Sequence, residues 1–342
     1  MRLIKEHAMS ETSSPLVTVN DLRVTFASRD ASINAVNGVS FELDPGEVLC
    51  ILGESGSGKS VTMRAMMRLL PKNTARISGQ IDIAGNDVVA MDDRAISDMR
   101  GPVVSMIFQE PMTAFDPVFT IGDQIAETIV RHEGISHAHA MARALELLDL
   151  VQIPSAKSRL KNYPFEMSGG MRQRAMIALA LSCRPSLLLA DEPTTALDAT
   201  VQIQILLLLR KLRDELGMAI MFVTHDIGVA VEIADKLAVM YAGRFVETGL
   251  VGSVFSNPAH HYTHGLMAST VKRANKGNRL LAIDGSPPDL AALPPGCAFA
   301  PRCRRADASC QADPPPETEI NTGHKAACYH PLGVSESVLV GS

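Results

Sequence analysis

The segment GESGSGKS, at positions 53–60, constrains this chain more than any other feature of its sequence. It matches the pattern G-x-x-x-x-G-K-[ST], a loop whose backbone N–H groups surround phosphate groups. The apolar run before it, residues 47–52, is typical of a buried strand, and residues 61–70 after it are typical of an amphipathic helix. Because this strand–loop–helix context is the one that the motif needs, the sequence predicts a nucleoside triphosphate site in an α/β fold.

The residues of this loop have separate expected roles. Lys59 would place a positive charge on the β- and γ-phosphates, and the Ser60 hydroxyl would be a ligand of Mg²⁺. The glycines allow the backbone to approach an anion closely. We therefore expect the whole loop to contact the nucleotide: Gly53, Glu54, Ser55, Gly56, Ser57, Gly58, Lys59 and Ser60.

Composition excludes some classes of protein. A net charge of −5 without a basic tract argues against a nucleic-acid-binding surface. The longest apolar runs are far shorter than the ~18–20 residues needed to cross a bilayer, and the first ten residues contain no signal-peptide core. We therefore expect a cytoplasmic protein that reaches a membrane only through partners. Residues 1–14 are expected to be polar and flexible, with either Met1 or Met9 as the true start.

The 342 residues suit one large α/β domain with an appendage. Continuous apolar runs at 102–108, 187–191 and 218–224 are typical of parallel strands buried on both faces. Residues 16–26 and 38–43 suggest an antiparallel edge, and 121–180 a helical subdomain inserted into the core, with overall limits near 112–182. Eight prolines between 287 and 316 make the tail appear too proline-rich for regular elements, so we divide the chain at about 266/267.

Three further features narrow the chemistry. The 187–191 run ends in Asp191, which would hold Mg²⁺, followed by Glu192, which would polarise the attacking water. A Ser-Gly-Gly-Met segment, 168–171, opens a helix with Ser168 as its cap. His225 follows the 218–224 run directly. Each feature alone has a simpler explanation. The two carboxylates could lie in a solvated turn, the segment 168–171 could be an ordinary helix start, and His225 could be a structural histidine.

Together and in this order, the motifs resemble the ATP-binding cassette (ABC) family over roughly residues 16–266. The resemblance implies a RecA-like P-loop core and two cassettes that sandwich two ATP molecules. It implies that ATP held by the opposite subunit contacts the segment made of Ser168, Gly169, Gly170 and Met171. It also implies that His225 is a switch residue and that Asp198 belongs to the loop after the carboxylates. It further implies that Gln109 senses the γ-phosphate and contacts Mg²⁺ with Ser60 and Asp191, and that Phe26 stacks on adenine.

Within this family, the chain is most similar to ATP-binding subunits of dipeptide, oligopeptide and nickel importers. The similarity rests on five stretches: 108–117 (FQEPMTAFDP), 163–174 (YPFEMSGGMRQR), 239–249, 257–266 and 296–303. It implies ATP-driven peptide import at the cytoplasmic face of the inner membrane. The implied partners are a second ATP-binding subunit, identical or paralogous, two transmembrane permease subunits and an extracytoplasmic solute-binding protein. Nickel or another small solute, and a redox-sensing ATPase module, remain alternatives.

Four of the six cysteines lie in the tail, as C-x5-C-x6-C-x17-C: Cys297, Cys303, Cys310 and Cys328. A disulfide framework is disfavoured in a cytoplasmic protein, and zinc sites usually contain closer cysteine pairs. The wide spacing therefore favours a [4Fe–4S] cluster, with zinc or free thiols as alternatives. We expect His260, His261 and His264 to be polar residues of a short helix rather than ligands, and the role of His324 stays open.

Overall fold

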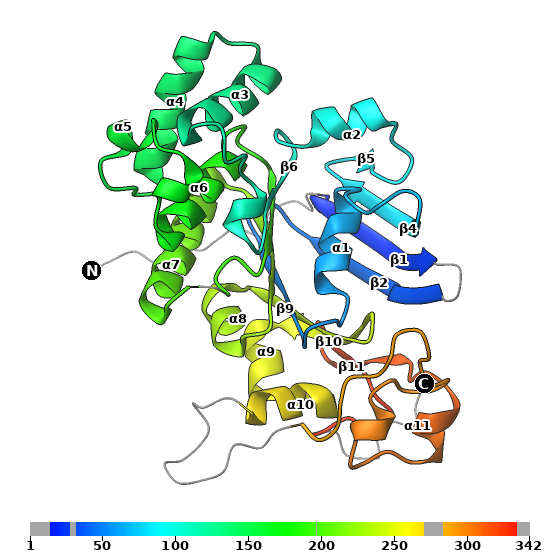
Figure 1. Ribbon diagram of the computed structural model, residues 1–342. Coiled ribbons are helices and arrows are strands. Elements are labelled where there is room, and N and C mark those ends of the chain that lie inside the picture. The colour runs from blue at the N-terminus through cyan, green and yellow to red at the C-terminus, as the bar shows by residue number, and fades with distance from the viewer. Residues whose placement is uncertain (1–13, 28–31, 196, 270–282, 334–342) are drawn as a thin grey trace, which may run out of the picture.

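The computed structural model describes residues 14–27, 32–195, 197–269 and 283–333. Two sheets and their helices make up the fold (Figure 1). The predicted N-terminal segment lies outside the described residues except for Ser14, as does the choice between Met1 and Met9.

The larger sheet has eight strands in the order β11-β12-β10-β9-β3-β8-β7-β6. Its centre is parallel, and every residue of β3, β7 and β8 is buried, as the continuous apolar runs predict. Strand β9 is parallel to β3, and β10 returns antiparallel to β9. The bounds are β3 Val48–Leu52, β6 Val104–Ile107, β7 Leu187–Asp191, β8 Ala219–Thr224, β9 Lys236–Tyr241 and β10 Arg244–Leu250.

The smaller sheet is antiparallel and has the order β2-β1-β4-β5. Helix α1 (Lys59–Met66) packs its buried methionines, Met63 and Met66, into an apolar cluster shared by both sheets. The helix predicted over 61–70 begins two residues earlier, at Lys59. It also ends earlier, because the backbone turns at Arg68, where φ is +49°. The bounds of the strands are β1 Val17–Ala27, β2 Ser32–Leu43, β4 Ala75–Ile83 and β5 Asn86–Asp87.

Helices occupy the chain between β6 and β7 and gather at one end of the molecule (Figure 1). Thr120, Ser136 and Ser168 accept hydrogen bonds from the first turns of α3, α4 and α6, which explains where these helices begin. The elements are η1 Pro111–Thr113, α3 Ile121–Glu133, α4 His137–Leu150, α5 Ala156–Arg159, η2 Pro164–Glu166 and α6 Gly169–Ala180.

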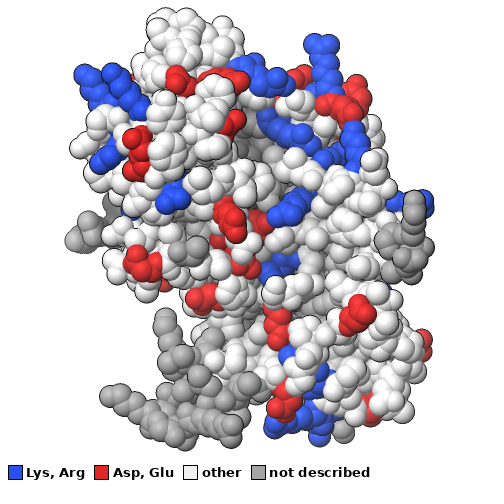
Figure 2. Space-filling view, viewed as in Figure 1, with Lys and Arg blue, Asp and Glu red and all other residues white. Residues whose placement is uncertain are grey.

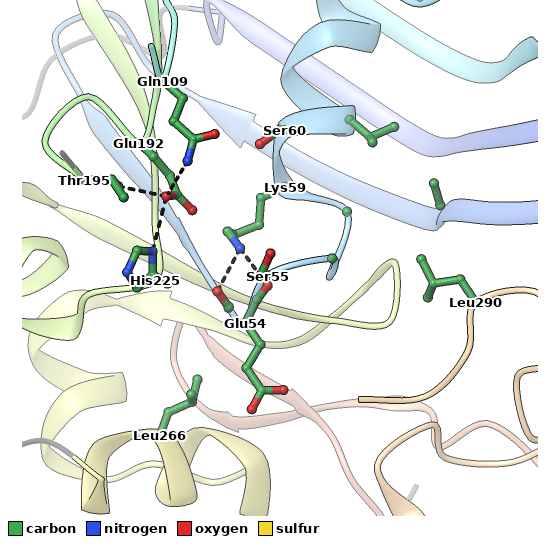
Figure 3. A pocket seen from close by; sticks show the side chains of 15 residues that line it. Glu54, Ser55, Lys59, Ser60, Gln109, Glu192, Thr195, His225, Leu266 and Leu290 are labelled. Carbon is green, nitrogen blue, oxygen red and sulfur yellow. Dashed lines mark hydrogen bonds and ion pairs between the residues drawn. The ribbon is translucent and has the colours of Figure 1, made fainter. Parts of the chain in front are cut away.

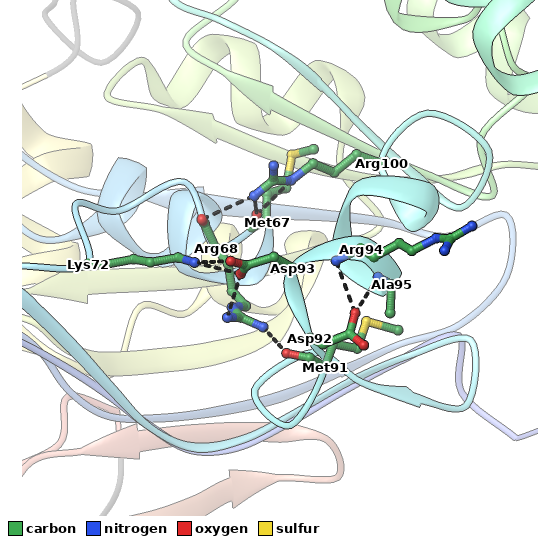
Figure 4. A network of polar contacts seen from close by, with 9 residues as sticks. All are labelled: Met67, Arg68, Lys72, Met91, Asp92, Asp93, Arg94, Ala95 and Arg100. Atoms are coloured by element: carbon green, nitrogen blue, oxygen red, sulfur yellow. Dashed lines mark hydrogen bonds and ion pairs between the residues drawn. The ribbon is translucent and has the colours of Figure 1, made fainter.

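A polar network joins α2 (Asp93–Met99) to the end of α1 (Figure 4). Arg100 donates to the carbonyls of Met67 and Arg68, and Lys72 pairs with Asp93. Lys and Arg gather over α2 in Figure 2, but acidic residues lie among them. The network therefore fixes the far end of the helix whose first residues belong to the phosphate loop.

The remaining helices flank the larger sheet: α7 Ala199–Leu216, α8 Ile227–Ile233, α9 Val251–Ser256 and α10 His261–Ala268. Within the described ranges, none of the helices combines the length and apolar character that a membrane span requires.

The tail contains regular elements, so the prediction that it is too proline-rich for them is wrong. Eight of its prolines, those between 287 and 316, precede the hairpin of β11 (Glu317–Asn321) and β12 (His324–Ala327), which turns at Gly323 with φ +71°. Strand β12 pairs with β10, so the tail extends the larger sheet. Two short helices, η4 (Ala300–Arg302) and α11 (Ala308–Ala312), complete it.

Candidate active site

The GESGSGKS loop joins β3 to α1 and passes close to neighbouring backbone. A Cβ atom at Gly53 would lie 2.3 Å from the Met240 carbonyl oxygen, and one at Gly58 would lie 2.4 Å from that of Ala35. Gly58 also has φ +108°, which a side chain would strain. Both glycines are therefore required by the path of the loop itself.

Lys59 is 4% exposed and donates to the carbonyl oxygens of Gly53 and Glu54, both at 2.8 Å (Figure 3). Burial lowers its pKa, while the nearby carboxylates of Glu192 and Asp191 oppose that shift. The ammonium group is thus held inside the loop, at the place where the motif predicts phosphate oxygens.

Ser60 and Asp191 meet at the carboxyl end of β7. The Ser60 hydroxyl donates to Oδ1 of Asp191 at 2.6 Å, and burial raises the pKa of this 1%-exposed carboxyl group. Its Oδ2 is buried without a hydrogen-bond partner, and Arg64 Nη2 lies 4.0 Å from it. A hydroxyl beside a carboxylate oxygen with no partner is a donor set that suits Mg²⁺.

Glu192 is the centre of the second half of the site. Its Oε2 accepts hydrogen bonds from Thr195 Oγ1 at 2.8 Å and Gln109 Nε2 at 3.3 Å, and His225 Nδ1 lies 3.3 Å from it (Figure 3). The backbone at Glu192 has φ +46°, an uncommon conformation for a residue with a side chain. The structure therefore brings together the three residues that were predicted to be catalytic: Glu192, Gln109 and His225.

One cleft of about 760 Å³ contains both halves of the site. Seven of the eight loop residues line it, whereas Ser57 is 5% exposed and is not among its lining residues. Sequence reasoning missed five other lining residues: Ala35, Val61, Thr195, Leu266 and Leu290. Thr195 lies three residues after Glu192 in the sequence, so its presence in the site could have been inferred from that spacing. Leu266 and Leu290 reach the cleft from segments that are distant in the sequence (Figure 3).

Several predicted nucleotide contacts lie outside this cleft. Ser168 accepts from Met171 N at 3.3 Å as the cap of α6, and Asp198 caps α7 through the N–H groups of Thr200 and Val201. None of the segment 168–171 lines the cleft. Phe26 packs against the apolar cluster between the sheets and does not line the cleft either, so its contact with adenine stays a prediction.

The four tail cysteines line a single small pocket with His260, His261 and His330. Burial raises the pKa of Cys297 and Cys303, and raises that of Cys328 to about 12. Such thiols stay protonated near neutrality unless a cation stabilises the thiolate. Within the part of the chain that the structure describes, the group of three ligand atoms within 4.8 Å of one another is Asp307, Cys310 and His330, not three of the four cysteines.

The histidines near the tail have structural contacts. His260 caps α10 by accepting from Tyr262 N, and burial lowers the His260 pKa to about 4. His324 Nε2 lies 2.8 Å from Oε1 of Glu247, and both side chains are almost fully buried. The role of His324, which the sequence left open, is therefore structural: its contact with Glu247 links β12 to β10.

Comparisons with known proteins agree with this geometry. Residues 36–195 match the family described as ABC transporter, and residues 246–310 match the oligopeptide/dipeptide transporter C-terminal region. A putative peptide import ATP-binding protein of Brucella melitensis is 49% identical over 92% of this chain and 96% of its own length. The oligopeptide transport ATP-binding protein OppD of Salmonella typhimurium is 47% identical over 94% of this chain and 96% of its own length.

Solved structures extend the comparison to the fold. A dimeric ATP-binding cassette in a post-hydrolysis state, bound to ADP and phosphate, superposes with a TM-score of 0.62 at 28% identity. It covers 69% of this chain and 98% of that cassette. A cassette from Clostridium perfringens, part of an ABC transporter complex, gives a TM-score of 0.61 at 25% identity over 71% of this chain and 92% of its own.

Proposed function

Because this chain belongs to the ATP-binding subunits of ABC transporters, we propose that it couples ATP hydrolysis to the import of di- or oligopeptides. The observation that carries the proposal is similarity to peptide import proteins over nearly the whole chain, tail included. The relatives' names supply the solute class, because the residues of a cassette contact ATP rather than the cargo.

The site residues divide the chemistry as follows. Lys59 and the loop amides bind the β- and γ-phosphates, and Ser60, Asp191 and Gln109 would hold Mg²⁺, which would neutralise charge on the phosphates. Glu192 accepts a proton from the attacking water, and His225 orients it by contact with Oε2. Gln109 donates a hydrogen bond to the same oxygen, a contact that supports a role for Gln109 in sensing the γ-phosphate.

We propose that two cassettes complete each site. None of the segment 168–171 lines the cleft of its own chain, and Ser168 and Gly169 are exposed at the start of α6. An exposed helix N-terminus presents N–H groups to an anion. In a head-to-tail pair it would meet the γ-phosphate bound by the other subunit, with Asp198 at the same interface.

The partners and location follow from the same reading. Two permease subunits, a second cassette and an extracytoplasmic binding protein would complete a transporter, with this chain peripheral on the cytoplasmic face of the inner membrane. We assign residues 15–266 to the cassette, with α3–α6 as its inserted helical subdomain, and 267–342 to the C-terminal extension.

We further propose that Cys297, Cys303, Cys310 and Cys328 hold one [4Fe–4S] cluster. Four thiolates around one zinc ion, at about 2.3 Å each, lie within ~4 Å of one another. The four cysteines share one pocket but do not form so compact a group, which suits a larger cluster better than one ion. When bound, the cluster would stabilise the thiolates and tie the loops of the extension together.

Transport in a reconstituted system tests the proposal. The chain would be co-purified with its membrane subunits and binding protein, placed in proteoliposomes with internal ATP, and offered labelled peptides or Ni²⁺. We expect ATP-dependent peptide uptake, and a Glu192→Gln complex as the matched control without uptake. Uptake of Ni²⁺ but of none of a set of di- to hexapeptides would contradict peptide import.

A further inference from the structure

The phosphate loop has a contact with the C-terminal extension that the ATPase mechanism above does not use. Arg302, in η4, extends its guanidinium to the side chain of Glu54, the second residue of the loop. Nη1 lies 2.8 Å from Oε2 and Nη2 lies 3.1 Å from Oε1, a two-pronged ion pair. The two residues are 248 positions apart in the chain.

The ion pair is built into a packed environment. The Arg302 side chain is 6% exposed and that of Glu54 is 26% exposed. The Arg302 Nε donates to the Asp284 carbonyl at 3.0 Å, and its guanidinium lies 5.9 Å from the ring centre of Tyr241 and 5.8 Å from that of Phe299. These contacts on several sides fix the guanidinium in one position.

The N–H, the carbonyl and the carboxylate of Glu54 each have a hydrogen-bond or ion-pair partner. Its N–H donates to the hydroxyl of the buried Tyr262 at 2.9 Å, its carbonyl accepts from Lys59, and its carboxylate binds Arg302. Glu54 therefore carries a negative charge into a loop that must receive a triphosphate. Without a cation beside it, this carboxylate would repel the nucleotide, because like charges interact strongly where water is partly excluded.

We propose that Arg302 is a positioning residue for ATP binding: it neutralises and orients Glu54, so that the phosphate loop binds the triphosphate more tightly when the C-terminal extension is folded against it. Arg302 directly precedes Cys303, one of the four pocket cysteines, so loosening the extension withdraws the cation from the loop.

The test measures MgATP affinity of the full-length chain by calorimetry for four variants. Arg302→Gln leaves the Glu54 carboxylate bare and should weaken binding about fivefold or more, raising KM with little change in kcat. Glu54→Gln removes the carboxylate charge but keeps the backbone N–H groups of the loop that bind phosphate, and should bind ATP at least as tightly as the parent. Arg304→Gln is the control, because Arg304 forms an exposed ion pair with Asp284 in the same extension, and should bind as the parent does.

The double variant Arg302→Gln/Glu54→Gln separates charge from structure. It lacks the same guanidinium as the single variant, but it has no bare carboxylate beside the phosphate loop, so its affinity should return close to that of the parent. Affinity of the double variant closer to that of Arg302→Gln would show that Arg302 only supports the fold, and would overturn the proposal. Parental affinity of Arg302→Gln, or weakened binding by Glu54→Gln, would overturn it as well.

Discussion

Replacing Glu192 with glutamine should slow ATP hydrolysis steeply while ATP binding persists. All three side chains around this residue approach one oxygen, Oε2, at 2.8 to 3.3 Å. A glutamine carbonyl can still accept from Thr195 and Gln109, so the substitution keeps the shape of the site. What it removes is the basic carboxylate, because an amide oxygen is too weak a base to take a proton from water.

The expected fall in kcat follows from the loss of this general base. General base catalysis contributes about 10²–10⁴ in rate, or roughly 3–5 kcal/mol of transition-state stabilisation. The Glu192 side chain is 12% exposed, so few bulk waters can replace it as a base. We therefore expect kcat to fall by about 10²–10⁴, with a dissociation constant for ATP close to that of the parent.

The assay is phosphate release in the purified transporter complex, with calorimetry for binding. Glu215→Gln is the matched control, because Glu215 is half-exposed on α7 and pairs with Lys211 one turn away. It should leave both quantities unchanged. Turnover by the Glu192→Gln complex at near the parental rate would show that another group, or water alone, takes the proton.

Three further predictions concern the loop, the shared site and the tail. Lys59→Ala should weaken ATP binding roughly 10- to 100-fold in calorimetry, because it removes the buried ammonium held at 2.8 Å inside the loop; parental affinity would contradict its role. A mixture of Lys59→Ala and Gly170→Asp chains should recover part of the phosphate release that each lacks alone, and failure to do so would argue against composite sites. Cys303→Ser should abolish the brown colour of anaerobically purified protein and its iron content, and should loosen the tail to protease; a colourless parent with stoichiometric zinc would replace the cluster by an ion.

The buried parallel core could be predicted from sequence because its signal is local. Residues 187–191 were predicted with both ends correct, and the 218–224 strand begins one residue later than expected. Continuous apolar runs between turn residues leave little choice of structure. The positions of the Asp191 and Glu192 carboxylates follow directly, since a side chain at the carboxyl end of such a strand lies at the edge of the sheet where ligands bind.

Short amphipathic and polar elements gave no comparable signal. Strand β4 alternates weakly, and its neighbour β5 has only two residues, Asn86 and Asp87. Their structure comes from pairing with β1, which is a tertiary effect. Phe26 shows the same limit: its position on β1 could be predicted, but the direction in which its ring packs could not.

The tail shows most clearly what local reasoning leaves out. Its prolines predicted a segment without regular elements, but η4 and α11 lie among them, and the strands after Pro316 depend on Glu247, which lies in β10. This buried carboxylate accepts from the N–H groups of Ala259 and His260 at 2.7 and 2.8 Å, and His324 Nε2 lies 2.8 Å from it. A buried carboxylate needs such partners, because desolvation without them is costly. One glutamate thus joins β10, the start of α10 and β12, and so holds the extension where Arg302 reaches the phosphate loop, an arrangement that no spacing of residues in the sequence reveals.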